Sequence, residues 1–504
     1  MDIRSRREFI AGGAALALTA CGGGGGSPSP APAPVVTPPP PPPSQAAVTF
    51  ANAGVHDPSV IRADGQFYVF GSHLAAARTP DLMNWTKLAD GVNNSNPLFG
   101  NKVTTELAET LAWAQTDTLW APDVVKLADG KFYMYYCACK GDSPRSALGI
   151  AVADKVDGPY VNKQLLLKSG QWGLASEDGT VYDGTRHPNV VDPSVFFDAT
   201  GRLWMVYGSY SGGIFIMELN ATTGLPLPGQ GYGKHLMGGN HARIEGAYIL
   251  YSPTSKYYYL FVSFGGLGAG TDGGYNVRIA RSLTPDGPYL DGAGTDMATV
   301  KGAAGTVFDD ASITPHGMKL MGAHQFANAT GETGTALGYI SPGHNSAYYD
   351  AAAGQYFIVF HTRFPGTGEL HEIRVHEMHL NEDGWLVIAP LRYAPLSLAT
   401  PAQTADVSAA QAAGSYKLVN HAKDIAAAAK ASINITLNAD GTVAGGMTGT
   451  WTHKAGNKIS LVSGGTTYAG VLSRQWNTNA GAFVVSFSAL SSGGVALWAI
   501  RTGT

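Results

Sequence analysis

A short phrase recurs five times between residues 56 and 348, and it constrains the fold more than any other feature of the chain. Each copy has a polar or acidic opening, a short β-rich stretch, a turn and a second, aromatic strand. The openings are His56-Asp57-Pro58-Ser59, Ala121-Pro122-Asp123-Val124, Val191-Asp192-Pro193-Ser194, Ile244-Glu245-Gly246-Ala247 and Gly343-His344-Asn345-Ser346. A repeat of about 50–100 residues built from strand, turn and strand is typical of propeller blades around an axis. We therefore expect the opening residues to meet near the centre.

The remaining organisation is also that of an all-β chain. The 65 glycines and the low charged fraction of 14% suit many strands and turns. Residues 414–504 hold short strands in succession, among them 431–437, followed by the hairpin signal Asn438-Ala439-Asp440-Gly441. We predict an all-β fold: a five-bladed β-propeller over residues 46–395, a linker over 396–413, and a small C-terminal β-barrel or sandwich over 414–504.

The N-terminus has the pattern of an export address. Ser5-Arg6-Arg7-Glu8-Phe9 looks like a twin-arginine signal, and the apolar stretch 11–20 is far shorter than the roughly 20 residues that span a bilayer. Leu18-Thr19-Ala20-Cys21 resembles a bacterial lipobox, so we expect lipidation at Cys21; an ordinary cleaved signal with an incidental cysteine is the alternative. Residues 22–45 are rich in Gly, Ser and Pro and predict a tether. The protein is then exported, and either lipid-anchored at the cell envelope or secreted.

Three of the repeated openings carry an acid at one repeat position: Asp57, Asp192 and Glu245. A single Asp before Pro is most often a turn residue, but a turn does not require an acid at three copies of one repeat. Carboxylates gathered in a cleft push their pKa values apart, so that one serves as base and another as acid. Hydrolysis of a glycosidic bond needs such a pair. Asp123, in the second copy, remains open between a structural and a functional role.

These phrases, in this order over residues 50–395, resemble glycoside hydrolase family 43, and most of all its endo-1,5-α-L-arabinanases. That resemblance implies a five-bladed propeller and an inverting mechanism. It implies that Asp57 is the general base, that Glu245 is the general acid, and that Asp192 tunes and orients that acid. The two carboxyls of an inverting pair stand roughly 6.5–9.5 Å apart. Many relatives have Ala-Pro after the acid where this chain has Gly246-Ala247, which we interpret as variation.

The same resemblance points to a metal and to sugar contacts. His344 matches a histidine beside a largely water-coordinated calcium ion; a hydrogen-bonded core histidine is the alternative, since calcium prefers oxygen ligands. The expected substrate-binding residues are His56, Trp120, Asn189, Tyr210 and Arg363. For the aromatic side chains the alternative is blade packing, and for Arg363 it is a surface salt bridge.

We therefore expect a monomeric, calcium-containing endo-arabinanase that acts on arabinan or arabino-oligosaccharides and contacts the membrane only through its lipid anchor. The net charge of −4 gives no reason to expect nucleic acid as a partner. One alternative keeps the fold but is an exo-acting α-L-arabinofuranosidase or β-xylosidase. Another is a glycan-binding surface lipoprotein without catalysis, against which the presence of all three acids argues. The C-terminal domain resembles that of larger extracellular arabinanases, and its role stays open.

Overall fold

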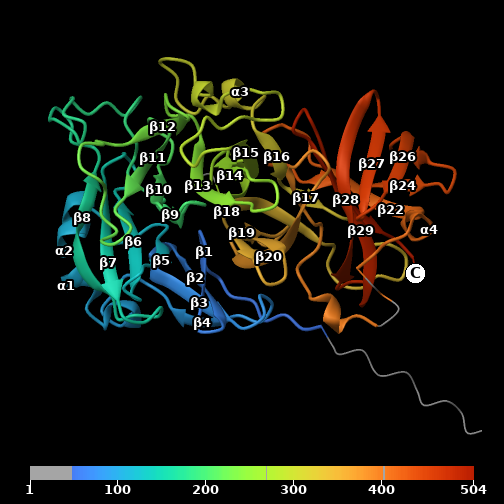
Figure 1. The fold of residues 1–504 in the computed structure, drawn as a ribbon, viewed down its shortest axis with the longest axis horizontal. Coiled ribbons are helices and arrows are strands. Elements are labelled where there is room, and N and C mark those ends of the chain that lie inside the picture. Colours follow the sequence, from blue (N-terminus) through green and yellow to red (C-terminus); the bar gives the residue numbers. More distant parts are fainter. Residues whose placement is uncertain (1–47, 268–269, 401–402, 404, 504) are drawn as a thin grey trace, which may run out of the picture. The chain divides into compact units, whose positions relative to one another are not determined.

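Five antiparallel sheets follow one another along the chain, and each forms one blade of a propeller (Figure 1). The computed structural model describes residues 48–267, 270–400, 403 and 405–503. The first two blades are β1 (Ser59–Ala63), β2 (Gln66–Gly71), β3 (Ala75–Thr79) and β4 (Thr86–Ala89), then β5 (Asp123–Lys126), β6 (Phe132–Cys139), β7 (Ser146–Ala153) and β8 (Val161–Lys168). The next two are β9 (Ser194–Phe197), β10 (Leu203–Tyr207), β11 (Ile214–Leu219) and β12 (Lys234–Met237), then β13 (Ile244–Tyr251), β14 (Tyr258–Phe264), β15 (Asn276–Ser282) and β16 (Met318–Met321). The fifth contains β17 (His324–Gln325), β18 (Gly338–Asp350), β19 (Gln355–Arg363), β20 (His371–Leu380) and β21 (Leu386–Ile388).

The first strand lies innermost in each of the first four blades, and β18 lies innermost in the fifth. β1, β5, β9, β13 and β18 contact one another in a ring, with β18 returning to β1. The second strands β6, β10 and β14 are buried along their whole length, which explains their aromatic and aliphatic composition. Apolar clusters fill the space between successive blades, and one of them joins the first blade to the fifth through side chains such as Val69 and Val359. The propeller predicted from the repeat is confirmed.

The C-terminal strands form a closed eight-stranded barrel, which decides between the barrel and the sandwich. β22 pairs with β30 and completes the closure. The strands are β22 (Gly414–Asn420), β24 (Ile433–Leu437), β25 (Thr442–Gly445), β26 (Gly449–Lys454), β27 (Lys458–Ser463), β28 (Thr466–Asn477), β29 (Ala482–Ser491) and β30 (Ala496–Arg501). The barrel interior is apolar, with Trp451, Leu461 and Phe487 buried in it.

The strand expected over residues 431–437 is divided between two sheets. β23 (Lys430–Ala431) pairs in parallel with β17 of the fifth blade, and only β24 belongs to the barrel. Backbone bonds from Lys430 to Ala323 and from Ser432 to Gln325 hold this crossing. Tertiary pairing therefore overrides a continuous local strand pattern.

Helices are few and short among the described residues. They are α1 (Val103–Glu106), α2 (Ala108–Ala114), α3 (Asp310–Ile313) and α4 (Ala409–Ala412), with 3₁₀ turns at Ser72–Leu74, Pro97–Phe99, Gly270–Asp272, Met297–Thr299 and Leu396–Leu398. No helix in the described part of the chain is long and apolar enough to cross a membrane. The predicted signal peptide, Cys21 and the tether lie outside the described residues.

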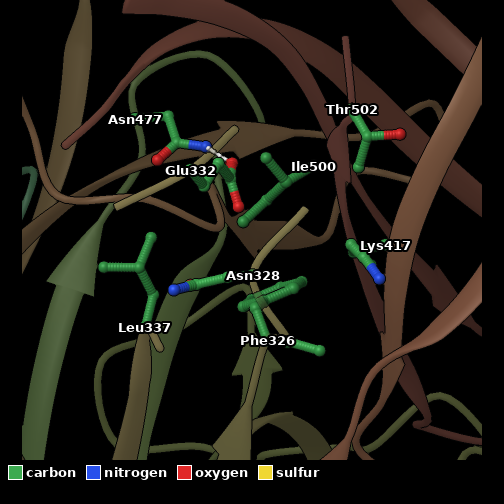
Figure 2. A pocket seen from close by; sticks show the side chains of 9 residues that line it. Phe326, Asn328, Glu332, Leu337, Lys417, Asn477, Ile500 and Thr502 are labelled. Atoms are coloured by element: carbon green, nitrogen blue, oxygen red, sulfur yellow. Dashed lines mark hydrogen bonds between the residues drawn. The ribbon is translucent and has the colours of Figure 1, made fainter. Parts of the chain in front are cut away.

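A small pocket of about 10 Å³ lies where the fifth blade meets the barrel (Figure 2). Asn477 donates a hydrogen bond to Glu332 Oε1 across it at 2.6 Å, and Phe326 and Ile500 also line it. No residue of the five repeated openings lines this pocket. The acids of the repeat therefore lie in another part of the propeller.

Candidate active site

The repeated openings meet at the propeller axis. A cavity of about 20 Å³ there is lined by Asp57, Ala121, Asp192, Ala247 and His344, one residue from each opening. The first three of these residues lie two positions before an innermost strand, and the last two lie within one. The radial repeat thus brings side chains separated by up to about 290 residues to one point.

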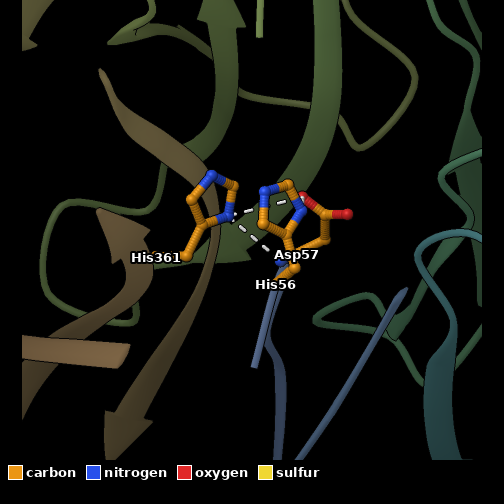
Figure 3. Close-up of side chains that lie close together, drawn as sticks. All are labelled: His56, Asp57 and His361. Carbon is orange, nitrogen blue, oxygen red and sulfur yellow. Dashed lines mark hydrogen bonds and ion pairs between the residues drawn. The ribbon is translucent and has the colours of Figure 1, made fainter. Parts of the chain in front are cut away.

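Asp57 is buried and surrounded by histidines. Its Oδ1 lies 3.0 Å from His56 Nδ1 and 3.1 Å from His344 Nδ1. Its Oδ2 accepts a hydrogen bond from the Ser72 hydroxyl, and its backbone N–H donates to His361 Nδ1 at 3.0 Å (Figure 3). Burial alone would raise the pKa of the Asp57 carboxyl, but His344 and His56 lower it well below its usual value. The site therefore keeps this carboxylate ionised.

The three side chains of Figure 3 offer metal-ligand atoms within 4.8 Å of one another. The Nδ1 lone pair of His361, however, already accepts the Asp57 N–H. Burial lowers the pKa of His361 well below its usual value, with His56 adding to the effect, which agrees with a neutral ring that accepts at Nδ1. His56 stacks on it with ring centroids 4.0 Å apart, so this cluster orients the carboxylate of Asp57 and is not a ready metal site.

Glu245 is the one acid of the three that is partly exposed. Its Oε2 accepts from Ser209 Oγ at 2.7 Å and its Oε1 from the Tyr275 hydroxyl at 2.9 Å. Burial of the carboxyl raises its pKa, although His344 and the two hydroxyl donors oppose the rise. A carboxyl with a raised pKa holds its proton to higher pH, and one that remains accessible can donate that proton to a bound molecule.

Asp192 lies between these two acids in chain order and is buried. Burial raises the pKa of its carboxyl to about 7; His344 opposes that rise and Glu245 adds to it. Its Oδ2 accepts from the Gly246 N–H at 3.4 Å, which ties it to the residue after the acid. Gly246 has φ +62, and a Cβ there would approach the His344 ring within 3.1 Å, so glycine suits this position.

His344 stands among the three carboxylates. Burial would lower the pKa of its imidazole, but Asp57 and Asp192 raise it to about 10. Asp57, Asp192 and His344 all have left-handed backbones, with φ of 53°, 57° and 40°. Such conformations are unfavourable for residues with a side chain and gather where a site dictates the geometry.

Asp123 is the first residue of β5, two positions after the place that Asp57 and Asp192 hold relative to their strands. Its carboxylate accepts from Ser59 Oγ in the first blade and from the Val195 N–H in the third blade at 2.5 Å. Burial raises its pKa. This carboxylate links three consecutive blades at the axis and does not line the cavity.

The predicted sugar contacts have different surroundings. Tyr210 is partly exposed beside Glu245, and Trp120 is partly buried against the packing between the second and third blades. The Arg363 guanidinium is buried, pairs with Glu369 at 2.6 Å, and leaves Nε and Nη1 without partners in the described residues. The Asn189 side chain is turned to Ser146 Oγ at 2.5 Å.

Sequence reasoning did not identify Ser72, Ser209 or Tyr275 as members of the site. One signal was present: a Gly-Ser pair, Gly71-Ser72 and Gly208-Ser209, occurs where the second strand of a blade ends. Those glycines allow close approach, since a Cβ on Gly71 would lie 1.9 Å from the His56 carbonyl oxygen. The serine after each glycine then donates a hydrogen bond to a carboxylate of the site, Ser72 to Asp57 and Ser209 to Glu245.

Comparison with known proteins agrees with this geometry. The profile of the glycosyl hydrolases family 43 matches residues 50–311, and that of a C-terminal lipocalin-like domain matches residues 390–499. The chain is 57% identical over 449 residues to the extracellular endo-α-(1→5)-L-arabinanase 2 of Bacillus subtilis, covering 89% of this chain and 93% of that protein. It is 48% identical over 460 residues to the extracellular endo-α-(1→5)-L-arabinanase of Thermotoga petrophila, covering 90% and 94%.

A solved structure resembles the whole described architecture. The crystal structure of a family 43 glycoside hydrolase from Bacillus licheniformis superposes with a TM-score of 0.86 at 56% identity. It covers 91% of this chain and 100% of that one.

Proposed function

This chain belongs to glycosyl hydrolase family 43, and from that premise we propose how it hydrolyses arabinan. It is an endo-acting glycoside hydrolase that cleaves α-1,5-L-arabinofuranosidic linkages, the activity carried in the names of two relatives that match it over most of its length. Neither the exo-acting alternative nor the non-catalytic one is favoured. The observation that carries the mechanism is the different setting of the two acids: Asp57 is buried among histidines, whereas Glu245 is partly exposed and accepts from two hydroxyls. The pKa shifts, downward at Asp57 and upward at Glu245, agree with these settings.

In the proposed reaction, Asp57 is the general base and Glu245 the general acid. Asp57 takes a proton from water while the water oxygen bonds to the anomeric carbon of the sugar. The bond from that carbon to the leaving oxygen breaks, and Glu245 delivers its proton to that oxygen. Attack from the face opposite the leaving group inverts the anomeric configuration.

Asp192 holds the acid in place and maintains its protonation. Its bond to the Gly246 N–H fixes the backbone beside Glu245. Its negative charge, when present, disfavours a second charge on Glu245, because like charges at short range raise each other's pKa.

We propose sugar contacts for the residues that face the site. Tyr210 and Trp120 offer ring surface to the apolar face of a furanose. Arg363 offers the unpartnered Nε and Nη1 to sugar hydroxyls, and His56 contacts the sugar beside the base. Asn189 accepts a hydrogen bond from Ser146 and supports the residues that contact the sugar.

We also propose that a calcium ion binds at the axial cavity beside His344. Two buried oxygens that face this cavity, Ser194 Oγ and Asn345 Oδ1, have no hydrogen-bond partner among the described residues. Oxygen donors and water are what calcium prefers, and the nearby carboxylates add negative charge. A bound ion would supply positive charge to this polar centre. Metal analysis of the purified protein should find calcium, and Asn345→Ala should lower the content; protein without calcium, with activity unaffected by chelator, would remove the ion.

Export agrees with the extracellular relatives. We propose further that Cys21 is lipidated and that the protein acts as a monomer at the cell envelope, with the membrane contacted only through the lipid. Mass spectrometry of the mature N-terminus and sedimentation of the purified protein test these two points.

The test of the activity is a time course of products from debranched arabinan. Endo cleavage releases a range of oligosaccharides at first, whereas single arabinose units from the outset would contradict it. The variant Glu245→Ala should lose this activity, and cleavage unchanged in that variant would overturn the assignment of the acid.

A further inference from the structure

Two half-exposed aromatic side chains lie on loops near Asp192 and Glu245, and neither has been assigned a role above. Trp172 is 54% exposed and Phe308 is 52% exposed. Trp172 belongs to the loop that leads from β8 to Asp192 at the start of β9. Phe308 belongs to the long connection between β15 and β16, which is joined to His241 by a backbone hydrogen bond.

These rings extend outward from the general acid. Tyr210 follows Ser209, whose hydroxyl donates to Glu245. The Tyr210 hydroxyl donates to the Gly265 carbonyl at 3.4 Å, and its ring meets that of Phe308 edge-on with centroids 5.7 Å apart. We call Tyr210, Phe308, His241 and Trp172 the aromatic strip. Its first two members, Tyr210 and Phe308, are in contact, and the strip begins beside the acid.

The strip continues from Phe308 to Trp172 through His241. The Phe308 N–H donates to the His241 carbonyl at 3.3 Å. A Cβ built on Gly184 would lie 3.4 Å from His241 Cε1 and 3.6 Å from Trp172 Cη2, so the two rings border the same glycine. Trp172 in turn rests edge-on against Tyr182, with centroids 5.0 Å apart. This contact with Tyr182 holds the exposed indole of Trp172 in position.

The backbone that carries these rings is strained. Tyr210, His241 and Phe308 have φ of 48°, 57° and 60°. Left-handed backbone is unfavourable for bulky residues and persists mainly where function uses it. Phe308 gains little from packing in return, because half of its surface stays in water.

The strip begins at the acid. Ser209, which donates to Glu245, directly precedes Tyr210, and Tyr210 contacts Phe308. This start places the strip on the side of the acid, where the leaving oxygen receives its proton. At its edge Arg243 pairs with Asp310, so these two charges neutralise each other and suit a neutral ligand.

We propose that Tyr210, Phe308, His241 and Trp172 form an extended subsite that binds the arabinan chain on the leaving-group side of the cleaved linkage. This inference rests on the proposed endo-arabinanase activity and deepens it. Aromatic rings pack on the apolar faces of successive furanose units, and a strip of several rings rewards a polymer more than a single sugar. The strip then favours internal cleavage over release from a chain end.

The test compares short and long substrates in Trp172→Ala and Phe308→Ala. The matched control is Phe197→Ala, an aromatic residue 40% exposed at the opposite end of β9. For arabino-octaose we expect kcat/KM to fall about two- to tenfold in each strip variant, as the loss of one aromatic contact implies. Arabinotriose should be cleaved as by the wild type, and the control should match the wild type on both.

Equal losses on both substrates, or no loss on arabino-octaose, would overturn the strip while leaving the activity intact. A wild type that cannot cleave arabinan would overturn the proposed function and the strip with it. A second readout removes any dependence on turnover: in a Glu245→Ala background, calorimetry should show weaker arabino-octaose binding when Trp172→Ala is added. A change in sedimentation of Trp172→Ala in place of weaker binding would assign the strip to self-association and contradict the proposal.

Discussion

The axis of the propeller and the interior of the barrel are both centres of closed β structures, yet they are built in opposite ways. The barrel interior is filled with apolar side chains such as Trp451, Leu461 and Phe487. The propeller axis instead holds two buried carboxylates, Asp57 and Asp192, and the imidazole of His344 around a small cavity.

The two centres also differ in backbone strain, which is concentrated at the propeller axis. Left-handed conformations occur at Asp57, Asp192 and His344, whereas in the described C-terminal domain only Ala422 and Asn457 among non-glycine residues adopt one. A chain that tolerates buried charge and strain in one region must gain stability in others. We infer that the barrel and the packing between blades stabilise the protein, and that the axis performs the chemistry. The predictions below test that division.

The largest effect is expected from the acids at the axis. Asp57→Asn and Glu245→Gln should each lower kcat/KM on arabinan by about 10²–10⁴-fold, because each removes a proton-transfer group. The control is Asp440→Asn, an exposed turn carboxylate of the barrel, which should leave kcat/KM unchanged. Either axial variant retaining wild-type activity would break the division.

A substitution in the barrel core should lower stability and leave catalysis unchanged. Phe487→Ala should lower the free energy of unfolding by about 3–5 kcal/mol, since it opens a cavity in an apolar core. The kcat/KM of the folded protein should stay near that of the wild type. Chemical denaturation checks the first value, with the exposed Val462→Ala as the control of small effect. Loss of kcat/KM in fully folded Phe487→Ala would contradict the comparison.

Asp123 should behave like the barrel although it lies near the axis. Asp123→Asn weakens the bonds to Ser59 and Val195 and should lower the free energy of unfolding by about 1–3 kcal/mol. The acid and alkaline limbs of the pH profile of kcat/KM should stay at the same pH values as in the wild type. A shifted limb would assign Asp123 to the catalytic group.

The smallest effect is expected from His56→Gln. His56 helps to hold the pKa of Asp57 low, so its removal should raise that pKa. The base must be ionised, and the acid limb of kcat/KM should therefore move to higher pH. Little change is expected in the neutral range, because glutamine keeps a polar group for the proposed sugar contact. His453→Gln in the barrel is the control, and a limb that moves to lower pH would contradict the role of His56.

Sequence reasoning reached the propeller and the positions of Asp57, Asp192, Glu245 and His344 because the repeat itself encodes them. It could not reach the stacking of His56 on His361, since the two rings are about 300 residues apart and no local pattern links them. Nor could it separate β23 from β24, because a two-residue parallel pairing leaves no periodic signal.

The second copy of the repeat illustrates the same limit at a single residue. Asp123 resembles another opening acid, but it follows its proline, whereas Asp57 and Asp192 precede theirs. It is therefore two positions later, and its carboxylate bonds to the neighbouring blades while Ala121 lines the axial cavity. The sequence contains this offset, but only the structure shows which partners the carboxylate reaches.

The central claim is that Asp57 activates water while Glu245 protonates the leaving oxygen, and the configuration of the first product tests it most directly. Proton NMR of freshly cleaved arabino-oligosaccharide, recorded before mutarotation, reports the anomer at the new reducing end. Because the substrate linkage is α, water activated by Asp57 should give the β anomer first. The α anomer as the first product would mean that a carboxylate attacks the sugar, and would contradict the account.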